Sequence, residues 1–185
     1  CGRRWQFTVT CRDAVGDALL AWKLDEGTGT TTADASGRGN TGMLRGGCTW
    51  VTPGRSGACV AMNGIDGYID CGNNASTNLT GDMTFSVWVK MNSGSYDQKI
   101  GGNQSGVSGG YKLCLYNSKA EFEVRDSQNR PHSNRDVAGG TILVMGNWYH
   151  IVGVYSEAEH WIKTYVNGQL DRTLQGNGTG GGLND

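Results

Sequence analysis

Short strand-like runs recur along most of this chain, and no segment shows the apolar spacing of an amphipathic helix. The runs are rich in Val, Ile, Tyr, Trp and Phe, and clusters of Gly, Asn, Asp and Ser separate them. Glycine makes up 31 of the 185 residues, as many tight turns require. The pattern predicts an all-β fold in which two antiparallel sheets pack together.

Eleven strands are expected after residue 17. They are residues 19–24, 49–51, 58–62, 68–71, 83–91, 111–116, 120–125, 141–145, 148–155, 161–166 and 169–173. The Asn167-Gly168 pair predicts a tight hairpin between the last two. Residues 3–10 alternate polar and apolar side chains and lie in a segment of different character. We therefore expect residues 1–17 to be an arm or an extra edge strand, and residues 18–185 to form one domain.

The charge balance and the apolar runs exclude two classes of partner. The chain has 16 Lys and Arg against 17 Asp and Glu, so its net charge is −1 and it lacks the basic excess of nucleic-acid-binding proteins. No apolar run approaches the length that a membrane-spanning helix needs. We expect neither nucleic acid nor a membrane span.

The cysteines predict an oxidising, extracellular location. The six are Cys1, Cys11, Cys48, Cys59, Cys71 and Cys114. None forms a Cys-x-x-Cys motif, so disulfides are favoured over zinc or redox chemistry. Pro53-Gly54 lies midway between Cys48 and Cys59 and predicts a hairpin with these two cysteines opposite each other and bridged. Subtraction leaves Cys1 with Cys11 and Cys71 with Cys114, and buried free thiols are the alternative.

Seven stretches resemble the laminin-G-like and concanavalin A-like jelly rolls. They are residues 20–29 (LAWKLDEGTG), 34–42 (DASGRGNTG), 54–57 (GRSG), 62–69 (MNGIDGYI), 85–90 (FSVWVK), 148–152 (WYHIV) and 165–168 (YVNG). The resemblance runs from about residue 18 to the end of the chain. It implies two packed antiparallel sheets, usually secreted, that bind carbohydrate or protein, but it names no ligand because this fold carries many functions.

The resemblance also implies a closing strand in the centre of a sheet, and the given sequence ends at residues 181–185 before it. An empty central position would expose backbone donors and acceptors. Either the chain is a fragment, or a strand from a neighbouring chain completes the sheet, as in a surface filament. Residues 3–10 are the candidate donated strand.

An oxygen-rich segment predicts a structural calcium site. It contains Asp25, Glu26, Asp34, Ser36 and Asn40 among glycines, and oxygen ligands suit Ca²⁺. The resemblance implies Asp34 and Asn40 as ligands, with Glu26 as a third. The alternative is an Asx turn in which Asp34 caps its own backbone.

Two loop segments predict glycan contacts, because sugars need aromatic rings beside amides and charged groups. One contains Tyr96, Asp97, Gln98, Asn103 and Gln104; the other contains Asp126, Gln128, Asn129, Arg130, His132, Asn134 and Arg135. The ligand-contacting candidates are Tyr96, Asp97, Asn103, Gln104, Arg130 and His132. Trp22, Trp88 and Trp148 lie in apolar runs and are expected in the core.

The sequence favours binding over catalysis. Glu121 and Glu123 alternate on one predicted strand, as the acid and base of a glycosidase would. An exposed strand with alternating charge explains them better, and no nucleophile motif accompanies the three histidines. We therefore predict an extracellular, non-catalytic binding or adhesion module for glycans. The alternatives are a subunit of a strand-completed assembly and a fragment of a glycan-active enzyme.

Overall fold

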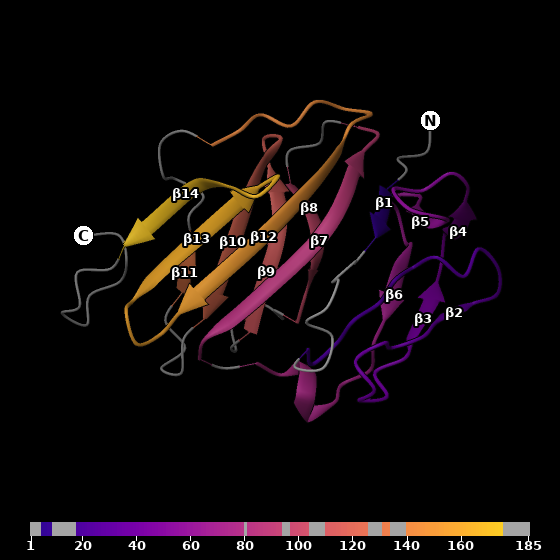
Figure 1. Cartoon of the computed structure of the whole chain (residues 1–185), viewed down its shortest axis with the longest axis horizontal. Helices are drawn as coiled ribbons and strands as arrows, with labels where there is room; N and C mark the ends of the chain where they lie inside the picture. The colour runs from indigo at the N-terminus through magenta and orange to yellow at the C-terminus, as the bar shows by residue number, and fades with distance from the viewer. Residues whose placement is uncertain are drawn as a thin grey trace. The chain divides into compact units, whose positions relative to one another are not determined.

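The computed structural model is nearly all β, as predicted (Figure 1). It describes residues 5–8, 18–79, 81–93, 97–103, 110–125, 131–133 and 140–175. Within these ranges its only helical element is the 3₁₀ turn η2 (Ala75–Thr77). The same residues include no helix with the length and apolar character needed to cross a membrane.

The strands follow one another along the described residues as fourteen short elements. They are β1 (Trp5–Thr8), β2 (Thr31–Thr32), β3 (Gly42–Arg45), β4 (Cys48–Val51), β5 (Cys59–Met62), β6 (Tyr68–Asp70), β7 (Met83–Met91), β8 (Asp97–Gly102), β9 (Gly110–Tyr116), β10 (Lys119–Arg125), β11 (Pro131–Ser133), β12 (Trp148–Ser156), β13 (Trp161–Val166) and β14 (Gln169–Gln175).

The chain divides into two compact units, where the sequence predicted one domain from residue 18. Unit 1 comprises Cys1–Thr77, Val87–Ser93 and Val144–Tyr149; unit 2 comprises Asn78–Ser86, Gly94–Leu143 and His150–Asp185. Strands β7 and β12 each contribute residues to both units.

Unit 1 contains two groups of strands. One has the order β7-β1-β5-β4, with β7 contributing Val87–Met91, and the other has the order β2-β3-β6. Trp22 packs against β3 and donates its indole N–H to the Asn40 carbonyl across 2.8 Å. A Cβ at Gly42 would lie 2.8 Å from the Trp22 ring, so only glycine fits there. Trp22 is only half-buried, so the prediction that it is a core residue is not met.

Strand β1 lies between β5 and β7 and is antiparallel to both. Gln6 is opposite Ala61 on one side and Lys90 on the other. The expectation that residues 1–17 are an arm or an extra edge strand is wrong for Trp5–Thr8, which has neighbours on both sides; the rest of this segment lies outside the described residues. Trp5–Thr8 therefore pairs within its own chain, and completion of a sheet by a neighbouring chain stays a prediction.

Unit 2 contains a sheet of order β14-β13-β12, continued by Met83–Ser86 of β7, and a second sheet of order β11-β10-β9-β8. Phe122 of β10 is fully buried and packs against Gly153 of β12. A Cβ at Gly153 would lie 2.5 Å from the Phe122 ring, so this glycine admits the close approach of the ring. Leu113, Leu115 and Ile162 complete a tightly buried core.

Nine of the eleven predicted strands are confirmed, and residues 83–91 and 161–166 match β7 and β13 at both ends. Residues 19–24 and 141–145 are not strands. The backbone N–H groups of Ala21, Thr141 and Val144 donate to side chains rather than to a neighbouring strand. The predictions missed β2, β3, β8 and β11, which are short or rich in Gly and polar residues.

The predicted Cys48–Cys59 disulfide is wrong. In the β4–β5 hairpin Cys48 is opposite Met62, whereas Cys59 is opposite Val51. This offset of three residues places the two thiols on opposite faces, because side chains alternate along a strand. The four cysteines in the described ranges, which also include Cys71 and Cys114, are free thiols. Cys1 and Cys11 lie outside those ranges.

Candidate functional site

The Asp34 carboxylate organises the loop that was predicted to bind calcium. Its Oδ1 accepts the N–H groups of Ala21 and Ser36 at 3.0 and 2.9 Å, and its Oδ2 accepts that of Asn40 at 2.9 Å. Burial opposes the charged form, but these hydrogen bonds and one from the Ser36 side chain lower the pKa of Asp34 below its usual 3.8. This is the geometry of the alternative interpretation, in which Asp34 caps the backbone.

The other two predicted calcium ligands also face hydrogen-bond donors. Asn40 is buried; its Oδ1 accepts from Asn74 Nδ2 at 2.8 Å and from Ser76 Oγ at 3.1 Å. Glu26 Oε1 accepts the Ala33 N–H at 2.8 Å. No cluster of three or more His, Cys, Asp or Glu side chains suited to a metal ion occurs in the described ranges. These three side chains have hydrogen-bond partners within the protein, and the calcium ion stays a prediction.

We expect Asp34→Asn to lower the free energy of unfolding at pH 7 by about 1–3 kcal/mol, because one of the two acceptor oxygens is lost and the remaining N–H groups lose a charged acceptor. Since the folded-state pKa is lowered, this contribution is present above pH 3.8 and is lost as the pH falls through the folded value. The variant should therefore lose less stability than the wild type on acidification below about pH 4. Urea unfolding at pH 7 and pH 3 measures both effects.

Asp70→Asn is the matched control, since that carboxylate accepts a single loop N–H, from Gly72. This variant should lower the free energy of unfolding by less than Asp34→Asn does. Repeating the unfolding measurements in Ca²⁺ and in EDTA tests whether a calcium ion binds here. A penalty for Asp34→Asn that disappears in EDTA would contradict the capping role and support the predicted calcium.

The structure separates two of the predicted glycan contacts. Asp97 opens strand β8 and Asn103 follows its last residue, so they lie about 20 Å apart at 3.3 Å per residue. The Asn103 side chain donates to Asn78 Oδ1 and accepts the Tyr111 N–H. Asp97 and Asn103 do not form one cluster, because the segment between them is an extended strand rather than a loop.

The second predicted cluster is described only in part. His132 lies on β11, opposite Val124 of β10. The sheet order puts β11 and β8 at opposite edges, three strand spacings or about 14 Å apart. Tyr96, Gln104 and Arg130 lie outside the described ranges.

The carboxylate pair of the enzyme alternative is unsuited to acid–base catalysis. Glu121 has no exposed surface and accepts a hydrogen bond from the Cys114 thiol at 3.2 Å. Burial and then the charge of Glu121 raise the pKa of Cys114, which keeps the thiol protonated. Glu123 pairs with Lys112 across 3.2 Å. A buried and a paired carboxylate do not line an open groove.

Ser86 and His150 form a pair that the sequence did not reveal, since 64 residues separate them. Ser86 Oγ and His150 Nε2 are 2.8 Å apart in unit 2. Burial lowers the pKa of His150, which favours its neutral form. A hydrogen-bonded Ser–His pair alone lacks the oxyanion donors that acyl transfer needs, so we treat it as a link between strands.

One face of the unit 1 sheet carries aromatic rings, cations and a pocket. The register places Lys90, Gln6, Ala61 and Thr49 across from one another on β7, β1, β5 and β4. Trp88 shares this face because it lies two residues from Lys90, while Val87 and Val89 point to the other side. We call it the tryptophan face and define it by Thr49, Ala61, Trp88, Lys90 and the Trp148 ring.

A cation lies against each tryptophan of this face. Arg55 Cζ is 4.4 Å from the centre of the Trp88 ring, and Lys90 Nζ is 5.2 Å from that of Trp148. Both tryptophans are half-buried. The expectation that they are ordinary core residues is therefore not met. Their place is set by strand alternation and by the cation–π contacts.

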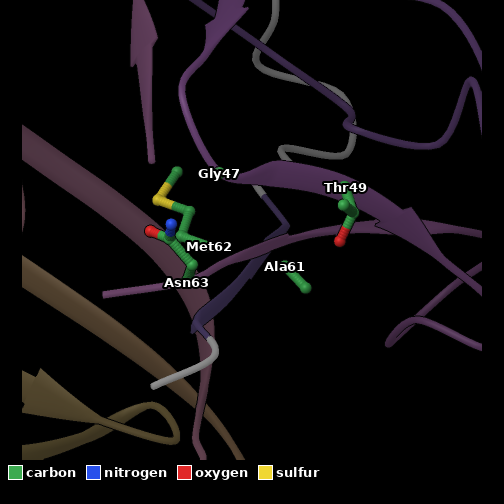
Figure 2. A pocket seen from close by; sticks show the side chains of 5 residues that line it. All are labelled: Gly47, Thr49, Ala61, Met62 and Asn63. Carbon is green, nitrogen blue, oxygen red and sulfur yellow. The ribbon is translucent and has the colours of Figure 1, made fainter. Parts of the chain in front are cut away.

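A cavity of about 240 Å³ opens on β4 and β5. Its lining consists of Gly47, Thr49, Ala61, Met62 and Asn63. Figure 2 shows Met62 and Asn63 on one side and Thr49 and Ala61 on the other. None of these residues was predicted as a site, because each looks like an ordinary strand or turn residue in the sequence.

A hydrogen-bond network fixes the polar side of the pocket. Asn63 Oδ1 accepts the N–H groups of Ile65, Asp66 and Gly67 at 2.9–3.1 Å. Its Nδ2 donates to Asp66 Oδ1 at 2.6 Å, and Gly47 donates to the same oxygen. An amide nitrogen carries two hydrogens, so one remains to donate to a ligand. The pocket therefore combines a fixed amide donor with the exposed hydroxyl of Thr49.

Comparison with protein families agrees with the resemblance read from the sequence. The family model described as the concanavalin A-like lectin/glucanases superfamily matches residues 63–184. The search of curated protein sequences found no match.

The fold is similar to clostridial toxin binding domains. The binding domain of Paraclostridial Mosquitocidal Protein 1 has a TM-score of 0.63 at 15% identity, covering 94% of this chain and 40% of that one. The receptor binding domain of botulinum neurotoxin C/D mosaic serotype has a TM-score of 0.59 at 17% identity, covering 87% and 40%. The botulinum neurotoxin serotype D ligand binding domain in complex with N-acetylneuraminic acid has a TM-score of 0.52 at 16% identity, covering 92% and 38%. The chain thus spans about 40% of the length of these structures.

Proposed function

The chain belongs to the concanavalin A-like lectin/glucanase superfamily, and we propose that it is a non-catalytic module that binds glycans through the tryptophan face. The observation that carries this proposal is the combination, on one face of one sheet, of two half-buried tryptophans with a pocket that has fixed polar groups. Superfamily membership and a similar fold seen in complex with N-acetylneuraminic acid support it.

The geometry suits a sugar for two physical reasons. The C–H face of a pyranose is apolar and packs on an indole ring, which loses little entropy because the ring is already held by its neighbours. Sugar hydroxyls need donors and acceptors in fixed places, and the Thr49 hydroxyl and the Asn63 amide offer both. The face therefore has a platform and a polar anchor.

Non-catalytic binding is favoured over glycan hydrolysis by the state of the two candidate carboxylates. Glu121 is buried and Glu123 is paired with Lys112. The proposed extracellular location rests on the superfamily, because the described cysteines carry free thiols and so lend it no support. It remains a prediction.

We expect the full chain to bind glycans on an array, and Trp148→Ala to weaken that binding by about tenfold or more, which is about 1.4 kcal/mol. Trp161→Ala is the matched control: Trp161 lies in unit 2 and also has a cation, Lys163 Nζ, 3.9 Å from its ring centre. Isothermal titration with the best array ligand measures both variants.

Thr49→Val gives a second test that keeps the shape of the side chain and removes the hydroxyl from the pocket. It should weaken binding while leaving the circular dichroism spectrum unchanged. Loss of binding in Trp161→Ala with full binding in Trp148→Ala and Thr49→Val would place the site elsewhere. No binding to any arrayed glycan would overturn the proposed function.

A further inference from the structure

We propose that the glycan held by the tryptophan face is acidic, with a carboxylate or sulfate group that Arg55 and Lys90 bind. This inference rests on the proposed function and names its ligand class. The observation behind it is the positive charge on this face, not the shape of the face.

Within the described residues, the two cations of this face have no acidic partner. Arg55 and Lys90 contact the Trp88 and Trp148 rings, and neither makes an ion pair with a carboxylate in the described part of the chain. Lys112, another half-buried lysine, does have a carboxylate partner, since its Nζ lies 3.2 Å from Glu123 Oε2. Two cations without a counter-charge create a local positive charge, and an anionic ligand would neutralise it.

The two cation–π contacts involve neighbouring positions of strand β7. Trp88, which lies under Arg55, and Lys90 are two residues apart on β7, which is about 7 Å along a strand. Both side chains project from the same face. We therefore expect the acidic group of a bound sugar to contact these two cations.

The cation–π contacts leave the hydrogen-bond donors available. A guanidinium that stacks on a ring keeps its N–H groups in the plane around it, and these form bidentate bonds with a carboxylate or sulfate. An ammonium likewise has three donors, of which a ring engages only one side. The rings thus orient Arg55 and Lys90 before the ligand arrives.

The attraction is local and not a property of the whole molecule. The net charge of the chain is −1, so general electrostatic steering does not draw acidic ligands to it. Neutralising one of two cations should therefore remove selectivity, whereas the same charge change at another lysine should not.

The test compares three ligands that share one core: lactose, 3′-sialyllactose and lactose 3′-sulfate. With the full chain at low salt we expect at least one of the two acidic ligands to bind about tenfold or more tighter than lactose. This preference should shrink as salt is raised, because the charges are only partly buried. The carboxylate and sulfate arms show which acidic group is preferred.

The variants Lys90→Met and Arg55→Met keep an apolar stem and remove the charge. Each should bring the acidic ligand close to the affinity of lactose. Lys163→Met is the matched control, since it removes the same charge and the cation–π contact of Trp161 in unit 2. It should leave the preference intact.

Equal affinity for lactose and both acidic ligands would overturn the inference and leave the proposed function standing. So would an acidic preference that Lys90→Met and Arg55→Met leave unchanged, because other residues would then supply it. If no glycan of any kind binds in the array experiment, both proposals fail together.

Discussion

Replacing Gln6 by proline is expected to lower the free energy of unfolding by about 3 kcal/mol or more. Gln6 lies in the middle of β1, opposite Ala61 of β5 and Lys90 of β7. In a strand with neighbours on both sides each N–H is directed to one of them, and proline has none. The substitution therefore breaks the strand that joins β5 to β7. Urea unfolding followed by circular dichroism measures the loss.

Gln6→Thr is the control for this experiment, because threonine keeps the N–H and favours strands. It should differ from the wild type by less than about 1 kcal/mol. Equal stability of Gln6→Pro and Gln6→Thr would contradict the interior position of β1 and return residues 3–10 to the edge or to a neighbouring chain.

Gly153→Ala is expected to lower the free energy of unfolding by about 1–3 kcal/mol, because the added methyl group overpacks a full core. Its Cβ would lie 2.5–2.9 Å from three carbons of the Phe122 ring. Phe122 is fully buried, so the ring has no free space into which it can move. Thermal and urea unfolding of the variant measure the effect.

The double variant Gly153→Ala with Phe122→Leu tests the cause. Leucine is smaller than phenylalanine, so the pair should lose less stability than the sum of the two single changes. If the stability losses of the two single changes simply add, the Phe122 ring and the added methyl group do not clash. The alanine effect would then need another explanation, such as altered strand pairing.

The local pattern of residues was enough to predict the class of fold and most of the strands. Residues 83–91 and 161–166 were predicted with both ends correct, because their alternation and their flanking turns lie within a few residues of each other. Residues 141–145 were wrongly predicted as a strand for the same reason. Their apolar pattern is local, but Ile142 and Val144 are exposed in the folded chain.

The local pattern of residues could not predict the strand register or which distant segments pack together. The sequence centred a turn between Cys48 and Cys59, but the offset of three residues between them came from the way β4 pairs with β5. The predicted calcium ligands lie within one short stretch of the sequence, but Asp34 accepts backbone N–H groups and Asn40 accepts from Asn74. Such contacts depend on segments that meet only after folding.

The sequence by itself determined that this protein is a β-sandwich of the concanavalin A-like kind, since strand alternation, glycine turns and family motifs are all local properties of the chain. Only the tertiary structure decided where a glycan is expected to bind. Arg55, Trp88, Lys90 and Trp148 come from three separate segments. Strand pairing brings Trp88, Lys90 and Trp148 together, and the connection between β4 and β5 carries Arg55 to the Trp88 ring. Each pairing is determined by the free energy of the whole folded sheet.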